Sequence, residues 1–410
     1  MTLNGSEALR LARVMAWMAV LVLALPSCDP SATGGAEGDD DDSSNDGDDV
    51  GDDDSEGDDD DSAAGDDDVA GDDDDSAPVG CGVCDGDRSI TSVADLKAAA
   101  ACEQIGGDLT VTLEADGEVD LGELGCLQSV EGELGIIDNE GLASLMGLEA
   151  LTAVGGDLRI RGNQGLTSLA GLESLASVGG SVTVSWNQDL ADLQGLSALA
   201  SVGDSIDVSV NGALADLVGF DGLVTLPGDL TVSRNNGLEH MSGLQSLTSI
   251  GGDLEVHDNP NLLDMTGLAA VATISGDLTV SWNGALVSIA GLAAVSSVGV
   301  DLDIYRNAVL EDLNGLGAIV SVAADMRIRE NSALLHLDHL ESLDTVGSDL
   351  TVGINSVLNS IDGLLSISSL GGGLRIHDNG GLCQSDAEAV AAQIPAKIEA
   401  QVQDNSGGCL

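Results

Sequence analysis

The chain has 410 residues, a formal net charge of −59 and only 1% aromatic residues. An acidic excess of this size argues against a nucleic-acid partner, which needs basic surface. The charge is unevenly spread, because Glu37–Asp75 holds 23 of the 71 acidic residues and no Lys or Arg. From Asp85 onward, 46 acidic residues still stand against 10 basic ones, which favours cations or basic partners. The scarcity of aromatic residues predicts a core of aliphatic side chains.

Residues 1–27 are predicted to be an export signal. Arg10 and Arg13 precede an apolar run, Val14–Leu25, that is too short to span a bilayer as a helix. The run ends in Leu25-Pro26-Ser27-Cys28, which resembles the lipobox of bacterial lipoproteins and marks Cys28 as the lipidated residue. The resemblance implies an exported lipoprotein of the outer membrane or cell surface, anchored by acyl chains. Ordinary secretion, with Cys28 free or paired, is the alternative.

Residues 28–80 are predicted to be a disordered, Asp-rich linker. Runs such as Asp39–Asp42 and Asp72–Asp75 are separated by Gly, Ser and Ala, and the segment lacks the apolar residues that folding needs. Repulsion between like charges extends such a chain. The alternative is weak Ca²⁺ binding, although the acids come in runs rather than in the alternating pattern of a calcium-binding loop.

The rest of the chain, residues 81–410, is organised around asparagines that recur every 24 residues. A fixed period of this length predicts one structural unit stacked on copies of itself. The side-chain amide both donates and accepts, so stacked copies can bond to one another and to turn backbone. The column consists of Asn139, Asn163, Asn187, Asn211, Asn235, Asn259, Asn283, Asn307, Asn331, Asn355 and Asn379.

One repeat, Asp157–Gly180, shows how each coil is built. Leu158 and Ile160 have strand spacing and point to one face, and after Asn163 the apolar residues come at every third position. This pattern predicts a coil that bends around a core and pairs in parallel with its neighbours. The fold class is therefore all-β: a parallel β-helix or leucine-rich-repeat-like solenoid, with eleven rungs spanning about 50 Å.

Caps are predicted at both ends of the solenoid. At the N-terminal end, Ser92–Ala101 should form a short helix with Ser92 as its N-cap. The first coil is irregular and carries Glu114 where the asparagine belongs. At the C-terminal end, Ser385-x-x-Glu388 predicts a capping box before an Ala-rich helix that Pro395 ends or kinks.

Six cysteines other than Cys28 lie at the two ends, which predicts disulfides formed in an oxidising compartment. Cys383 pairs most simply with Cys409, since no other cysteine is near them in sequence. For the others we choose Cys84–Cys102 and Cys81–Cys126. Cys81-x-x-Cys84 also has the spacing of a redox or zinc site, but no second such pair accompanies it.

The repeat Gly-Asp-Leu-x-Val-x-x-Asn-x-x-Leu-x-x-Leu-x-Gly-Leu-x-x-Leu-x-x-Val-Gly resembles the receptor L domain. Cys84-Asp85-Gly86, the helix, Cys102 and Ile105–Leu109 resemble the start of that domain, and the likeness covers roughly Cys84–Cys409. It implies a right-handed β-helix capped by helices and disulfides, and it supports Cys84–Cys102. Eleven uninterrupted asparagine rungs exceed a single L domain, and the receptors' cysteine-rich and kinase modules are absent from this sequence. Only an extracellular binding scaffold is therefore implied.

Outward-facing residues carry the candidate binding site. Trp186, Trp282 and Tyr305 are three of only four aromatic residues outside the signal, and an exposed aromatic strip suits a sugar or protein ligand. Trp282 shares a column with Arg306, and Tyr305 with Arg329, so the alternative is a pair of cation–π contacts. Asp303 and Arg327 should form a surface ion pair of little energetic weight.

No catalytic set is predicted. His336-x-x-His339 has ligand-like spacing but no third ligand, so a turn is the better interpretation, and no metal or cofactor is expected. The favoured function is a non-catalytic, membrane-tethered extracellular module that binds a protein or glycan. The alternatives are a structural stalk without a specific ligand and a polysaccharide-active β-helix enzyme.

Overall fold

The computed structural model describes residues 81–113 and 120–409. They belong to one compact unit, Asp74–Leu410. The predicted signal, Cys28, the Asp-rich linker and Glu114 lie outside the described residues. Within the described part, no helix is long and apolar enough to cross a membrane.

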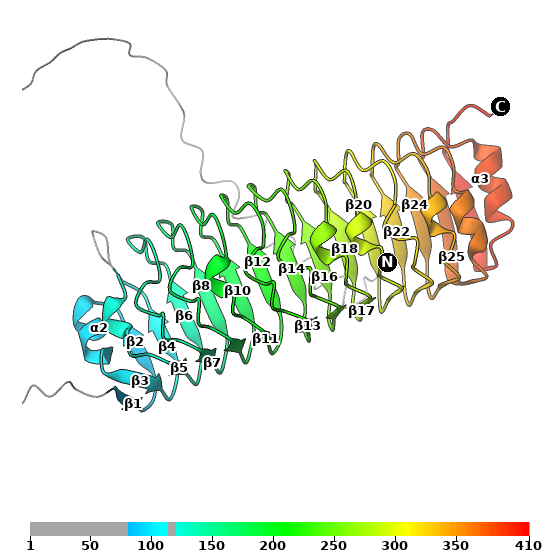
Figure 1. Cartoon of the computed structure of the whole chain (residues 1–410). Helices are drawn as coiled ribbons and strands as arrows, with labels where there is room; N and C mark the ends of the chain where they lie inside the picture. Colours follow the sequence, from blue (N-terminus) through cyan, green and yellow to red (C-terminus); the bar gives the residue numbers. More distant parts are fainter. Residues whose placement is uncertain (1–80, 114–119, 410) are drawn as a thin grey trace, which may run out of the picture. The chain divides into compact units, whose positions relative to one another are not determined.

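The unit is a parallel β-solenoid, as the 24-residue period predicts (Figure 1). One side is a ladder of fourteen described strands, most of them paired in parallel with a partner 24 residues away. Each regular strand has four residues. In β8, the inward residues Leu158 and Ile160 alternate with the outward residues Arg159 and Arg161. The strands are β2 (Arg88–Ile90), β4 (Leu109–Val111), β6 (Leu134–Ile137), β8 (Leu158–Arg161), β10 (Val182–Ser185), β12 (Ile206–Ser209), β14 (Leu230–Ser233), β16 (Leu254–His257), β18 (Leu278–Ser281), β20 (Leu302–Tyr305), β22 (Met326–Arg329), β24 (Leu350–Gly353), β25 (Ser369–His377) and β26 (Ala396–Gln403).

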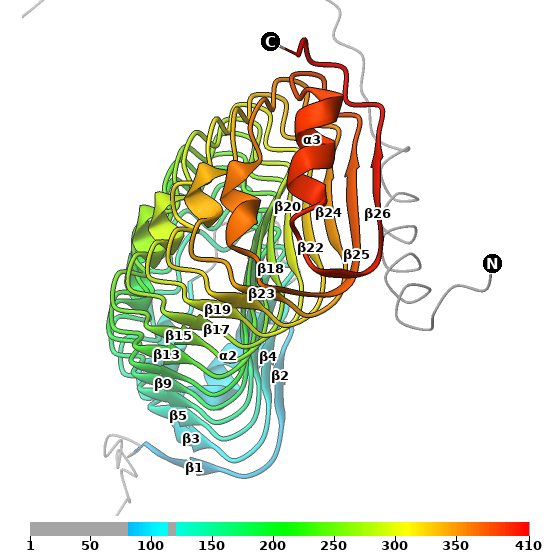
Figure 2. The same cartoon turned by 90° about the vertical axis from the view of Figure 1, so that its right-hand side faces the viewer.

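A second parallel ladder of shorter strands forms another side of each coil (Figure 2). Its strands are β1 (Gly82–Cys84), β3 (Cys102–Ile105), β5 (Ser129–Val130), β7 (Ala153–Val154), β9 (Ser177–Val178), β11 (Ser201–Val202), β13 (Thr225–Leu226), β15 (Ser249–Ile250), β17 (Thr273–Ile274), β19 (Ser297–Val298), β21 (Ser321–Val322) and β23 (Thr345–Val346), which pairs with β25. The β-pairing is interrupted between β11 and β13. In most coils the residue after the short strand donates its N–H to the preceding coil, as Gly203 does to Val178 and Gly251 to Leu226. Pro227 occupies this position and has no N–H to donate.

Turns and short 3₁₀ helices close the remaining side of the coils. The helices are η1 (Gly122–Leu124), η2 (Gln194–Leu196), η3 (Thr266–Leu268), η4 (Ala290–Leu292), η5 (Asp338–Leu340) and η6 (Asp362–Ser366). Here the backbones of successive coils approach closely. A Cβ at Gly171 would lie 2.1 Å from the carbonyl oxygen of Leu145, and the residue has a φ of +114°. This approach explains the glycine in the Leu-x-Gly-Leu segment of the repeat.

The core is one aliphatic column inside the coils. In the coil that begins at Asp157, the inward residues Leu158, Ile160, Leu166, Leu169, Leu172, Leu175 and Val178 are all buried. The every-third-residue spacing is therefore confirmed as a coil that shows one residue inward per short segment. Phe220 takes a leucine position in the same core.

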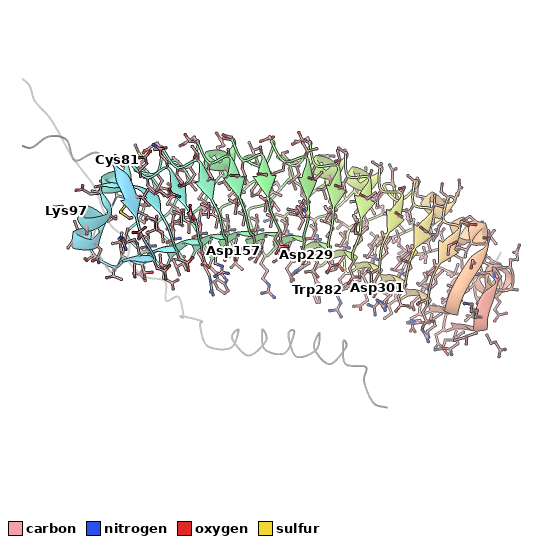
Figure 3. All side chains as sticks on the ribbon, turned by 90° about the horizontal axis from the view of Figure 1, so that it is seen from below. Cys81, Lys97, Asp157, Asp229, Trp282 and Asp301 are labelled. Atoms are coloured by element: carbon pink, nitrogen blue, oxygen red, sulfur yellow. A yellow bond between two sulfur atoms is a disulfide. The ribbon has the colours of Figure 1, made fainter. Side chains whose placement is uncertain are left out.

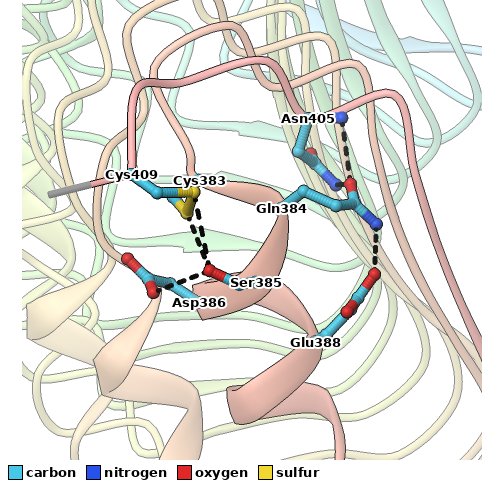
Figure 4. Close-up of a disulfide and its surroundings, with 7 residues drawn as sticks. All are labelled: Cys383, Gln384, Ser385, Asp386, Glu388, Asn405 and Cys409. Atoms are coloured by element: carbon cyan, nitrogen blue, oxygen red, sulfur yellow. Dashed lines mark hydrogen bonds between the residues drawn. A yellow bond between two sulfur atoms is a disulfide. The ribbon is translucent and has the colours of Figure 1, made fainter.

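Helices cap both ends of the solenoid. Helix α2 (Val93–Ala99) begins after Ser92, whose Oγ accepts a hydrogen bond from the backbone N–H of Asp95, as predicted. Helix α3 (Gln384–Ala391) differs from prediction, because Cys383 is its N-cap and makes no side-chain capping bond. The Ser385–Glu388 capping box is wrong: Glu388 accepts from the Gln384 amide at 2.8 Å (Figure 4). Helix α3 ends four residues before Pro395, and β26 begins directly after that proline.

The three predicted disulfides are confirmed. Cys81 bonds to Cys126, Cys84 to Cys102, and Cys383 to Cys409. The first two fasten the N-terminal cap, and the third ties the last residues of the chain to the start of α3 (Figure 4). Cys81-x-x-Cys84 is thus divided between two disulfides.

Candidate binding surface

The asparagine column is a continuous hydrogen-bonded ladder inside the turns. All eleven side chains are at most 1% exposed. In the regular rungs, Oδ1 accepts from the backbone N–H of the asparagine one coil earlier, as Asn187 does from Asn163 at 3.0 Å. Its Nδ2 donates to a strand carbonyl of that coil, which for Asn187 is Ile160 at 3.0 Å. The ladder is therefore structural and carries no ligand group.

The ladder continues one rung further than the 24-residue period indicates. Asn405 Oδ1 accepts from the Nδ2 of Asn379 at 3.1 Å, and its own Nδ2 donates to Ile376 and to Gln384. Its spacing from Asn379 is 26 residues because the C-terminal cap is longer than a regular coil. With β2, β4 and β26 included, the long-strand ladder spans about 60 Å rather than the predicted 50 Å.

The residue before each of these asparagines adopts a left-handed backbone conformation. Every described rung from Asp138 to Asp404 has φ between +54° and +74° at this position, and only Gly162 among them is a glycine. The left-handed conformation turns the chain sharply at the end of the strand. The asparagine therefore points inward, while the left-handed residue directly before it points outward. The column includes Trp186, Trp282 and Arg306.

Both tryptophans are exposed at this edge of the long-strand ladder, Trp186 by 38% and Trp282 by 47%. The predicted cation–π geometry is present. The Arg306 guanidinium carbon lies 4.1 Å from the centre of a Trp282 ring, and that of Arg329 lies 5.7 Å from the Tyr305 ring. Arg306 also binds Glu330 on the next coil at 2.5 Å. The arginines therefore hold two of the three predicted aromatic side chains, and Trp186 is set apart from them along the rod.

The opposite edge of the long-strand ladder is a column of carboxylates. In each case the Oδ1 of one aspartate accepts the backbone N–H of the next column residue, as Asp229 does from Asp253 at 2.8 Å and Asp253 from Asp277 at 2.7 Å. The column includes Asp229, Asp253, Asp277, Asp301, Asp325 and Asp349 on consecutive coils. Figure 3 shows Asp157, Asp229, Trp282 and Asp301 along the same long side of the unit.

Arginines bind carboxylates of this column toward both ends of the ladder. Arg159 binds Asp157 at 2.8 Å and Glu133 at 2.7 Å, and Arg375 binds Asp349 at 2.7 Å. Arg327 contacts Asp301, Asp303 and Asp325 together.

The prediction that Asp303 and Arg327 form an ordinary surface pair needs correction. Their side chains are only 15% and 26% exposed and belong to a cluster of four charged groups. Burial is the largest influence on the Asp303 carboxyl and raises its pKa, although Arg327 opposes the shift.

Between these ends lies a surface that we name the central panel: the outward side chains of β10, β12, β14, β16 and β18. These five strands contain no Lys or Arg. The side chains on this side of the strands are Thr183, Ser185, Asp207, Ser209, Thr231, Ser233, Glu255, His257, Thr279 and Ser281. Ser185, Ser233 and Ser281 are buried, and the others are partly exposed. Trp186 follows the first strand and Trp282 follows the last, so one tryptophan lies at each end of the panel.

Two half-buried carboxylates lie in the panel. Burial raises the pKa of Asp207, with Ser209 and His257 opposing it, and the buried Oδ1 of Asp207 has no hydrogen-bond partner. Burial also raises the pKa of Glu255; His257 opposes this rise, and the charges of Asp253, Asp229 and Asp277 add to it. Both groups are therefore held where a cation would relieve their desolvation.

Other predicted sites take ordinary structural positions. His336 and His339 flank the start of η5 with ring centres 5.8 Å apart, and the Nδ1 of His336 lies 3.5 Å from Asp338. Among the residues that the structure describes, no group of three or more His, Cys, Asp or Glu side chains is arranged to hold a metal ion.

Comparison with known proteins finds no match to a protein-family model and none to a curated protein. The binding surface therefore has to be interpreted from its own geometry.

Proposed function

We propose that this protein is a non-catalytic, extracellular binding module tethered to a bacterial membrane. Cys28 carries the lipid anchor, residues 28–80 act as a spacer, and the solenoid presents the central panel to its partner. The likeness of the repeat to the receptor L domain supports an extracellular binding scaffold. Its acidic surface favours a cationic partner over a nucleic acid.

The observation that carries the proposal is the pair of tryptophans at the ends of the panel. Trp186 and Trp282 keep large apolar side chains exposed on a chain with very few aromatic residues. Both do so at left-handed backbone positions where glycine is the least strained residue. Exposed indoles on a rigid support are the usual anchors of sugar and protein ligands.

The test is an array of glycans and extracellular proteins probed with the purified full chain. We expect a hit that is lost when Trp186, Trp282 and Tyr305 are replaced by Ala. Val287, which is 55% exposed, supplies the control, and Val287→Ala should leave the hit unchanged. A hit that is retained in the triple variant removes the aromatic side chains from the proposal.

A structural stalk is the second candidate, because the asparagine ladder runs through every regular coil and makes a stiff rod. An array without hits favours it. A polysaccharide-active enzyme is the least supported candidate, and release of oligosaccharides by the pure protein would establish it.

The anchor is tested separately. Mass spectrometry of the protein from bacterial membranes should show Cys28 as an acylated N-terminal residue. An unmodified thiol within an uncleaved or differently cleaved chain contradicts the lipoprotein proposal. Calcium titration would test the alternative that the Asp-rich linker binds Ca²⁺ weakly.

A further inference from the structure

The first outward position of the five panel strands alternates between threonine and a carboxylate, which is a period of two coils. Asp207 and Glu255 are 48 residues apart, with Thr183, Thr231 and Thr279 at the same strand position in the intervening coils. Strands in register are roughly 4.8 Å apart, so the two carboxylates are separated by about 9.6 Å along the rod. The panel therefore offers alternating carboxylate and hydroxyl groups to a ligand that lies along the solenoid axis.

We propose that the central panel binds a linear glycan of β-1,4-linked 2-amino sugars whose amino groups are free. This inference rests on the proposed binding function and specifies its ligand. One disaccharide of an extended β-1,4-linked chain is close in length to two coils. Each carboxylate then meets an amino group of a successive disaccharide, and the threonine hydroxyls between them meet sugar hydroxyls.

The charges of the panel select an amine-bearing chain over a neutral or acidic one. Its strands carry no Lys or Arg, and Glu255 lies among Asp229, Asp253 and Asp277 at the panel edge. Arg234, the arginine beside the panel after β14, lies 3.8 Å from the Asp258 carboxylate. Asp207 and Glu255 are half-buried, and an ammonium group that reaches either carboxylate would form a charge-assisted hydrogen bond with it. Charge-assisted hydrogen bonds of this kind are stronger than neutral ones.

The tryptophans suit the same ligand. Trp186 and Trp282 are four coils apart, roughly 19 Å, which is the length of about two such disaccharides. An indole presents a flat apolar face on which a pyranose ring can stack. Arg306 lies over the Trp282 ring, and the side chain is still 47% exposed, so it is both held in place and accessible.

Isothermal titration of the purified full chain with a glucosamine hexamer, in mildly acidic buffer of low ionic strength, tests the proposal. We expect binding that weakens with added salt. The double variant Asp207→Asn/Glu255→Gln should lower the affinity by about tenfold or more, since each substitution removes a charge-assisted contact. Glu311→Gln, at an exposed turn outside the panel, is the matched control and should bind as the original chain does. Circular dichroism of each variant confirms that the fold is kept.

Two further probes give the other outcomes. An N-acetylglucosamine hexamer has the same backbone without the charge and should bind more weakly. Oligolysine has the charge without the sugar rings, and its binding should not depend on Trp186. Failure of the glucosamine hexamer to bind, or binding that the double variant leaves unchanged, overturns the assignment. If oligolysine or the acetylated hexamer binds instead of the glucosamine hexamer, and the double variant weakens that binding, the ligand class is overturned while the binding function stands.

Discussion

Replacement of Asn259 by Ala tests how much one rung of the asparagine ladder contributes to stability. The Asn259 side chain is fully buried. Its Oδ1 accepts from the backbone N–H of Asn235 at 3.0 Å, and its Nδ2 donates to the carbonyls of Val232 at 2.9 Å and His257 at 3.2 Å. Alanine removes all three bonds and leaves the N–H of Asn235 facing a methyl group.

The expected loss follows from the buried groups that remain. An unsatisfied buried donor costs about 1–3 kcal/mol, and the weakened carbonyls and the small cavity add to it. We therefore expect Asn259→Ala to lower the free energy of unfolding by about 3 kcal/mol. Denaturant unfolding followed by circular dichroism measures this loss. Since each coil contacts only its neighbours, faster amide exchange should be confined to the coils around β14 and β16.

Asn261→Ala is the matched control. Asn261 is exposed and donates to the carbonyl of Asn236 at 2.8 Å, so its loss should change stability by less than about 1 kcal/mol. If Asn259→Ala destabilises the chain no more than Asn261→Ala, the ladder is not a main source of cohesion between the coils.

Three further substitutions test other parts of the structure. Glu255→Gln should raise the unfolding midpoint at pH 7, because the raised pKa of Glu255 in the folded state means that its charged form is disfavoured by folding. The gain should fade as the pH falls through the raised pKa of Glu255 and vanish below the ordinary glutamate pKa, where both states are protonated. A gain that is constant with pH would contradict the cause given. Ile354→Gly should not destabilise the fold, since relief of a β-branched residue at φ +60° offsets the added freedom of the unfolded chain; a clear drop in the thermal midpoint would count against backbone strain at this column. Pro227→Gly should add an amide that is protected from hydrogen exchange by the carbonyl of Val202, whereas rapid exchange there would show that the proline does not cause the break between β11 and β13.

The repeat made most of the fold predictable. A 24-residue period fixes which residues share a column, so the buried asparagines, the inward leucines and the stacking of Arg306 on Trp282 follow from counting. The cysteines add the caps, because six of them lie only at the two ends. Each of these predictions depends on spacing along the chain, which the sequence contains directly.

The C-terminal cap was less predictable because its spacing changes. Asn405 completes the ladder 26 residues after Asn379. The sequence predicted a helix that Pro395 ends or kinks, and it did not predict the strand β26 that follows this proline. Ser385-x-x-Glu388 has the residues of a capping box, but the helix begins two residues earlier than that box requires. The usable signal was Asp404-Asn405, which repeats the Asp378-Asn379 pair of the preceding coil.

The carboxylate edge and the central panel could not be found from one repeat. A single coil shows Asp229 beside a strand, and only the stack shows that its Oδ1 accepts the N–H of Asp253. The panel likewise depends on which strands lack an outward arginine. This property appears only when Asp207 and Glu255 are viewed together with the arginine clusters at either end.

The left-handed column bears on whether the exposed side chains have a purpose. A non-glycine residue in this conformation is disfavoured by roughly 1–2 kcal/mol, and glycine would remove that strain. The structure tolerates the strain at Trp186 and Trp282 because the adjoining asparagine is fixed in its ladder and determines the turn. The side chains at the left-handed positions therefore take no part in core packing, and the surface that they form has to explain which residues stand there. Two indoles, one at each end of five strands without arginine or lysine, are compatible with the extended, cationic ligand proposed above.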